Sequence, residues 1–169
     1  MYHDLKPWLE AVSLESNPIV VLLDGLEDPR NFGAILRTCE AVGVDAVVIP
    51  KKRSVQVTDT VRKTSTGAAD LVNVIQVSNL NNTIHSLKQK GFWIVGLEAD
   101  GPSDYFDLDL VMPVVLVVGS EGSGLSRLVK ENCDFVASIP MLGQISSLNA
   151  SVAAALLLYE ALRQRRQPR

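Results

Sequence analysis

Short runs of consecutive apolar residues alternate along this chain with stretches in which apolar residues recur every three or four positions. Such runs are typical of strands buried on both faces of a parallel sheet, and the longer periodic stretches indicate amphipathic helices. The clearest run is 114–118, which is unbroken and mostly β-branched. The pattern predicts strands over 19–23, 46–49, 72–77, 92–97, 114–118 and 135–139, and helices over 32–42, 79–90, 125–132 and 150–165.

Strands that alternate with helices predict an α/β fold with a mainly parallel sheet flanked by helices. The 169 residues fit one domain, and 47% hydrophobic residues indicate a globular protein. We expect 1–17 to be a leader or linker remnant and 18–169 to be the domain. No apolar run approaches the roughly 18 residues of a membrane helix, and the first residues do not resemble a signal peptide. We therefore expect a cytoplasmic protein without a membrane partner.

The net charge of −3 weighs against nucleic acid as a partner, but basic residues cluster locally at Lys51–Arg53, at Arg62 and Lys63, and over 163–169. Charge alone leaves two interpretations of these clusters open, a solvated surface and a contact with RNA. Cys39 and Cys133 have no metal-ligand spacing between them or with a histidine. We expect two reduced cysteines and no metal site.

Three segments that follow strands carry the candidate chemistry, because ligands of open α/β sheets bind at the carboxyl ends of the strands. In the first, 24–37, Asn31 is open to two interpretations, as a helix cap or as a site residue. Arg37 lies off the apolar stripe of the same helix, so it is either plain helix surface or functional. The second, 117–125, has the spacing G-x-x-G-x-G around Glu121, which fits neither a dinucleotide fingerprint nor a Walker loop. Glu121 alone is equally explained as an acid facing a helix dipole.

The third segment, 139–160, places Ser146, Ser147 and Asn149 directly before a helix of alanine and leucine. A helix cap accounts for one of these residues, and three exceed what capping needs. Taken together, the segments resemble the three signature motifs of the SpoU (TrmH) branch of the SPOUT methyltransferases. The matches are D-x-x-x-D-P-x-N-x-G-A-x-x-R-T at 24–38, V-x-G-x-E-G-x-G at 117–124, and I-P-M-x-G-x-x-x-S-L-N-x-S-V-A at 139–153, with Ala150 where valine is common.

This resemblance, which covers about 18–166, implies a deep trefoil knot in the C-terminal part of the sheet, the SPOUT or α/β knot. It implies S-adenosylmethionine as cofactor, with S-adenosylhomocysteine as product. The residues matching the cofactor-binding positions are Leu97, Gly119, Ile139, Met141 and Leu148. The residues matching the catalytic positions are Asn31, Arg37, Glu121, Ser147 and Asn149. Arginine is a poor base because its pKa exceeds about 12, so we expect Arg37 to hold a phosphate and to stabilise developing alkoxide charge.

The implied reaction is methylation of a ribose 2′-hydroxyl in RNA. The text between the motifs, such as 67–70, resembles bacterial 23S rRNA guanosine 2′-O-methyltransferases. The alternatives are a tRNA ribose methyltransferase and a non-catalytic RNA-binding ribosome-assembly protein. Close relatives often carry an additional N-terminal RNA-binding domain, so the chain is either a catalytic fragment or a short natural enzyme.

The family also implies a homodimer. The apolar helix over 150–162 predicts the interface independently, because a helix that is apolar all round must be buried all round. We expect Leu157, Leu158 and Tyr159 to supply its apolar area, and Ala153, Ala154 and Ala155 to permit close approach. The alternative is that the knot covers the whole helix within one chain.

Overall fold

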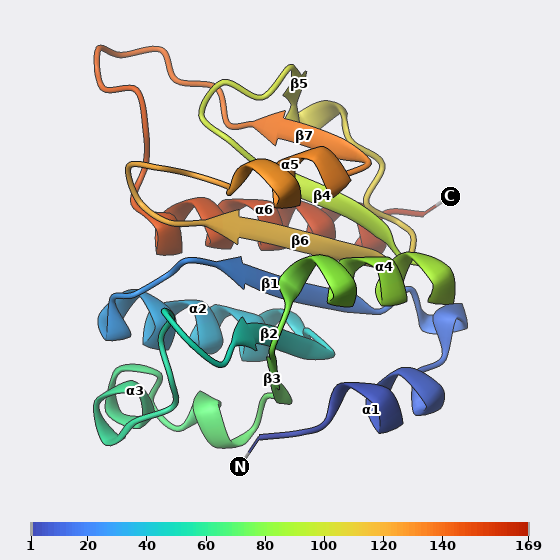
Figure 1. Cartoon of the computed structure of the whole chain (residues 1–169). Coiled ribbons are helices and arrows are strands. Elements are labelled where there is room, and N and C mark those ends of the chain that lie inside the picture. Colours follow the sequence, from blue (N-terminus) through green and yellow to red (C-terminus); the bar gives the residue numbers. More distant parts are fainter. Residues whose placement is uncertain (1, 169) are drawn as a thin grey trace.

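A seven-stranded, wholly parallel sheet forms the centre of the computed structural model, which describes residues 2–168 (Figure 1). Its strand order is β3-β2-β1-β6-β4-β7-β5. The strands are β1 (Ile19–Asp24), β2 (Ala46–Pro50), β3 (Val74–Val77), β4 (Trp93–Leu97), β5 (Ser103–Asp104), β6 (Val114–Gly119) and β7 (Phe135–Ser138). The α-helices are α1 (Leu5–Ala11), α2 (Pro29–Val42), α3 (Asp59–Thr64), α4 (Leu80–Lys90), α5 (Arg127–Asn132) and α6 (Ala150–Arg166). Short 3₁₀ turns lie at Leu14–Ser16, Ala68–Asp70 and Tyr105–Asp107.

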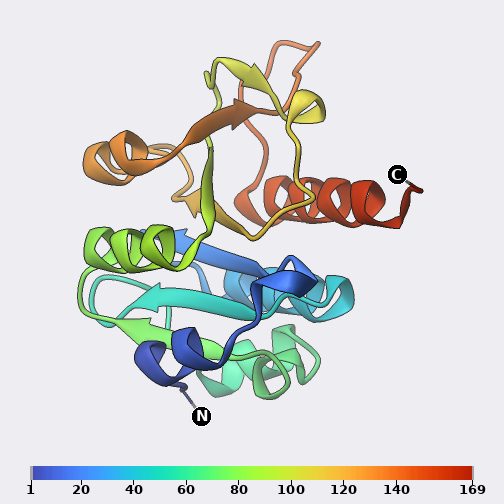
Figure 2. The same cartoon turned by 90° about the vertical axis from the view of Figure 1, so that its right-hand side faces the viewer.

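Helices cover both faces of the sheet, which confirms the predicted α/β architecture. Figure 2 shows α1, α4 and α5 on one side of the strands and α2 and α6 on the other. Alternate residues of β1 enter the two resulting cores: Val21 and Leu23 face α2 and α6, and Val20 and Leu22 face α4. Every residue of β6 is buried, as expected for a run without polar positions. Among the described residues, none of the helices combines the length and the apolar character that a bilayer crossing requires.

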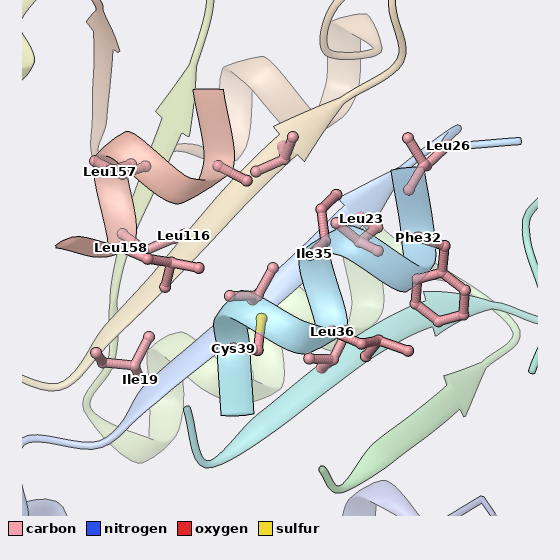
Figure 3. Close-up of a cluster of buried hydrophobic side chains, with 14 of the residues drawn as sticks. Ile19, Leu23, Leu26, Phe32, Ile35, Leu36, Cys39, Leu116, Leu157 and Leu158 are labelled. Carbon is pink, nitrogen blue, oxygen red and sulfur yellow. The ribbon is translucent and has the colours of Figure 1, made fainter. Parts of the chain in front are cut away.

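The larger core fixes α2 against α6. Figure 3 shows Ile35 and Cys39 of α2 pointing into the same cluster as Leu157 and Leu158 of α6, with Leu116 of β6 beside them. All five side chains are at most 1% exposed. This packing matters for the site because Asn31 lies in the first turn of α2 and Asn149 caps α6.

Two elements went unpredicted because they are short and lack a clear period. α1 lies inside the segment expected to be a leader, and its Trp8 packs against Phe92, with ring centroids 6.2 Å apart. The backbone N–H of His3 donates to the carbonyl of Val74, which ties the beginning of the chain to β3. β5 has only two residues and pairs with β7 at the edge of the sheet.

The last turn of α6 is fastened to the segment that precedes β6. The side-chain amide of Gln164 accepts from the backbone N–H of Leu110 at 2.8 Å and donates to the carbonyl of Leu108 at 2.9 Å. The guanidinium of Arg165 donates to the carbonyls of Leu110, Met112 and Asn17 at 2.7–3.1 Å. We call these contacts of Gln164 and Arg165 the α6 clasp. They hold the segment before β6 across the end of the last helix.

Candidate active site

A cavity of about 440 Å³ opens at the carboxyl ends of β4, β6 and β7. Its size lies within the usual range for small-molecule sites, and its place is the edge at which parallel sheets bind ligands. In Figure 1 this is the edge from which the long loop between β7 and α6 extends. The lining residues come from four segments: Leu97, Glu98 and Ala99; Val118 to Gly124; Ile139 and Met141; and Ser146 to Ala150 with Ala153.

All five residues that the sequence predicts for cofactor contact line this cavity. Leu97 ends β4 and Ile139 follows β7, and both are partly buried against the larger core. Met141 and Leu148 lie at the two ends of the loop that leads into α6. Gly119 ends β6, where a Cβ atom would stand 2.3 Å from the carbonyl carbon of Gly124. A side chain at this position would therefore displace the glycine-rich loop.

The glycine-rich loop, residues 119–125, folds back on itself. Ser120 and Gly124 exchange backbone hydrogen bonds of 2.9 and 3.2 Å. Two carboxylates fix its far end: Glu98 accepts from the N–H of Leu125 at 2.5 Å, and Asp24 accepts from the N–H of Ser126 at 2.7 Å. The sequence interpretation gave neither acid a role. The available signal was their place, since each follows or ends a buried strand at the carboxyl edge of the sheet.

Asn31, Glu121 and Asn149, one from each motif, join in a single hydrogen-bonded group. Oε1 of Glu121 accepts from the side-chain amides of Asn31 and Asn149, at 2.8 Å each, and from the N–H of Ala150 at 3.3 Å. Asn149 also donates to Oδ1 of Asn31 at 3.2 Å. Oε2 of Glu121 has no hydrogen-bond partner within residues 2–168. One carboxylate oxygen thus connects the three motifs.

Asn31 and Asn149 were both candidates for helix caps, and only Asn149 is one. Asp28, not Asn31, caps α2, because its carboxylate accepts from the N–H of Arg30 at 2.8 Å. The capping interpretation of Asn31 is therefore wrong, and its side chain is free to bind Glu121 from inside the helix. Asn149 does cap α6, accepting from the N–H groups of Ser151 and Val152. Ser147 lines the cavity and is exposed.

Arg37 is not brought to the cavity in the single chain. It lies six residues after Asn31 on α2, which turns it about 240° round the helix axis, or about 120° away from Asn31. It is exposed, and no ion pair or hydrogen bond of its side chain occurs among the described residues. Arg30, seven residues earlier, shares this outer face of α2. Arg37 therefore separates from the other predicted catalytic residues.

The remaining reactive groups lie away from the cavity. Burial raises the pKa of the Cys39 thiol well above its usual value. Burial, opposed by Lys88, raises the pKa of Cys133 to about 11. Neither thiol ionises appreciably at neutral pH. Within residues 2–168, no three His, Cys, Asp or Glu side chains gather in a way that could hold a metal ion.

Comparison with known proteins matches residues 18–159 to the SpoU rRNA Methylase family. A TrmH family tRNA/rRNA methyltransferase of Staphylococcus saprophyticus is 59% identical over 146 residues, which are 86% of this chain and 59% of that protein. The chain thus spans less than two thirds of the length of this relative.

Solved structures agree with the sequence match. The SpoU methyltransferase AviRb from Streptomyces viridochromogenes, in complex with AdoMet, superposes with a TM-score of 0.86 at 32% identity, over 98% of this chain and 66% of that one. The TrmH/SpoU tRNA modifying enzyme of A. aeolicus gives a TM-score of 0.81 at 33% identity, over 95% of this chain and 81% of that one. This likeness implies the SPOUT knot in the C-terminal part of the chain, as the sequence motifs predicted.

Proposed function

Because the chain belongs to the SpoU rRNA methylase family, we propose that it transfers a methyl group from S-adenosylmethionine to a ribose 2′-hydroxyl of RNA. The observation that carries this proposal is the group formed by Asn31, Glu121 and Asn149 at the cavity. Three segments far apart in the sequence meet there through one carboxylate. Polar groups that converge on an apolar cavity are the usual arrangement of a small-molecule reaction site.

The cavity suits this cofactor chemically. Leu97, Ile139, Met141 and Leu148 offer apolar walls for an adenine ring, and the backbone of the glycine-rich loop offers N–H and C=O groups at its edge. When bound, the cofactor supplies a methyl group on a positively charged sulfur, which is already a good electrophile. What the protein must add is orientation and the handling of one proton and one developing negative charge.

The side chains divide these tasks. Glu121 holds Asn31 and Asn149 in place through Oε1 and presents Oε2 to the substrate. Ser147 and Asn149 shape the floor of the site. Arg37 would bind a phosphate next to the reacting ribose and stabilise the negative charge that develops on the 2′-oxygen, while that oxygen gives its proton to water and takes the methyl group. It does not act as a general base, because a guanidinium stays protonated at neutral pH.

The substrate proposed is a guanosine of 23S rRNA. Its support is the resemblance of the sequence between the motifs to that group of enzymes, and a tRNA ribose remains the second candidate because the same motifs serve both RNAs. The deciding experiment compares 2′-O-methylated nucleotides, by mass spectrometry, in rRNA and tRNA from cells with and without this protein. Loss of one ribose methylation from 23S rRNA is expected. Unchanged methylation in both RNAs would favour the non-catalytic assembly protein.

A homodimer completes the proposed site, and α6 supplies its interface. Leu157 and Leu158, expected at the interface, are instead buried within the chain at 0% and 1% exposure, as is Ala154. The exposed apolar face of α6 consists of Val152, Leu156 and Tyr159, at 48%, 39% and 50% exposure. α2 and α6 cover the same face of the sheet (Figure 2), so a partner seated on this face of α6 also lies over the outer face of α2. Arg37 of one protomer then serves the cavity of its partner.

Light scattering at micromolar concentration is expected to give twice the chain mass of 18.4 kDa. Leu156→Glu should shift the protein towards the monomer, because it buries a charge in the apolar interface. The matched control is Leu71→Glu, since Leu71 is 72% exposed on the β3 side of the molecule, away from α6. A monomeric unaltered protein, or equal effects of the two changes, would contradict the proposed interface.

Cofactor binding is expected to need neither a metal ion nor RNA. The cavity belongs to one chain, and its two carboxylates, Glu98 and Glu121, already accept hydrogen bonds from N–H groups of the protein. Titration calorimetry with S-adenosylmethionine in a chelating buffer should therefore give the same affinity as in buffer with magnesium. Binding that disappears in chelator and returns with a divalent ion would refute this.

A further inference from the structure

The loop after β2 carries three consecutive cations, Lys51, Lys52 and Arg53, and all three are exposed. The ion pairs within the described residues lie elsewhere, so these charges are not neutralised by the protein. We call Lys51–Arg53 the basic loop. Uncompensated cations are common on protein surfaces. The position and the conformation of the loop must therefore show whether it is a binding surface.

The basic loop is held in a defined shape. The N–H of Lys51 donates to the carbonyl of Val77, and the amide of Gln56 donates to the carbonyl of Pro50 at 3.1 Å. Gln56 is in turn fixed by the side-chain amide of Gln76 and by the hydroxyl of Tyr2, which donates to it at 3.2 Å. This network fixes the backbone at the start of the basic loop, which lowers the backbone entropy lost when the loop binds a ligand.

Arg53 itself has a backbone conformation that disfavours its residue type. Its φ is +56°, in the left-handed region that suits glycine. Strain of this kind persists only where the surroundings impose it, and it concentrates at functional sites.

The two residues that follow the basic loop, Ser54 and Val55, connect it to the first motif, which adjoins the proposed site. The carbonyl of Leu26 accepts from the N–H of Val55 at 2.9 Å and from the hydroxyl of Ser54 at 3.3 Å. Leu26 follows Gly25, and a Cβ atom on Gly25 would stand 3.6 Å from Cβ of Ser120, a cavity residue. The basic loop, the first motif and the glycine-rich loop are thus neighbours along one edge of the sheet.

We infer that the basic loop binds the phosphate backbone of the RNA that enters this site. The inference rests on the proposed function for the identity of the polyanion. Lysine and arginine on a preformed loop contact phosphates without reading sequence, which fixes the register of an RNA and leaves selectivity to other surfaces. The nearest carboxylates are Asp28, which caps α2, and Glu27, and neither forms an ion pair with Lys51, Lys52 or Arg53 among the described residues.

The test measures binding of a labelled stem-loop RNA, as a function of salt, to the full chain saturated with S-adenosylhomocysteine. The double variant Lys51→Ala with Lys52→Ala should weaken binding by about tenfold at 0.15 M salt and flatten the slope of log K against log salt by about 1.4–1.8. The matched control, Lys6→Ala with Lys90→Ala, removes the same charge from α1 and α4 and should leave the slope unchanged. Equal losses in the two double variants, or no loss in the first, would overturn the inference.

The variant Arg53→Gly distinguishes an effect on RNA binding from an effect on the stability of the fold. Glycine relieves the positive φ, so the melting temperature should stay or rise, while RNA affinity should fall several-fold. A merely structural role for Arg53 would move the two measurements in the same direction. Because the readout is RNA binding, it does not depend on turnover. A chain that binds RNA through the basic loop but methylates no RNA would refute the proposed function and leave this inference standing.

Discussion

Arg37→Ala is expected to lower methyl transfer to saturating RNA by about 10²–10³-fold, the usual cost of losing one preorganised electrostatic group. Cofactor affinity should stay within a few-fold, because Arg37 does not line the cavity that we propose for the cofactor. Single-turnover rates and calorimetry measure the two quantities separately. Near-normal turnover would remove Arg37 from the mechanism, and a lost cofactor site would show that the substitution acts through the fold.

Mixing two inactive variants tests whether Arg37 acts across the dimer. Gly119→Ala should disable the cofactor cavity, because its Cβ atom would collide with the backbone of Gly124. When Arg37→Ala and Gly119→Ala chains are unfolded and refolded together, about half of the dimers are mixed and each mixed dimer has one intact site, so about a quarter of the original activity should return. No recovery would place Arg37 in the site of its own chain. Each variant refolded alone is the control.

Glu121→Ala is expected to reduce turnover by about 10²-fold, because it releases Asn31 and Asn149 from their shared partner and small misplacements in a reaction site have costs of this order. Melting temperature should fall only slightly, since Glu121 is exposed and α6 keeps its Asn149 cap. Turnover within a few-fold of the unaltered protein would contradict a central role for this carboxylate.

Glu121→Gln is the matched variant for this position. Its amide oxygen can still accept from Asn31, Asn149 and the N–H of Ala150, while the negative charge is lost. It should therefore keep the geometry and the cofactor affinity and still turn over slowly, which isolates the contribution of Oε2. If the glutamine variant is fully active, Glu121 is a positioning residue only.

Local sequence was sufficient for the strands and long helices, because their signals are contained within each segment. β1 up to Leu23 and all of β6 are apolar and buried on both faces, and Gly43 and Gly91 end α2 and α4. The sheet order could not be predicted in the same way. β6 lies between β1 and β4, so the centre of the sheet is filled by a strand that comes late in the chain.

The same contrast between local sequence signals and long-range contacts applies to the site residues. Whether Asn31 caps a helix or joins a site depends on Glu121, which lies 90 residues away in the sequence. Periodicity showed that α6 is apolar all round, but which face the chain itself covers depends on where α6 docks. For this reason the buried pair proved to be Leu157 and Leu158, and the exposed face Val152, Leu156 and Tyr159.

The α6 clasp has a consequence for the order in which a newly made molecule becomes competent. Gln164 and Arg165 fix one end of α6, and its other end brings Asn149 and Ala150 to Glu121. The cavity therefore takes its described shape only when α6 has docked against the sheet. Under the proposed function, S-adenosylmethionine is expected to bind only molecules in which α6 is seated, and to stabilise them according to its concentration.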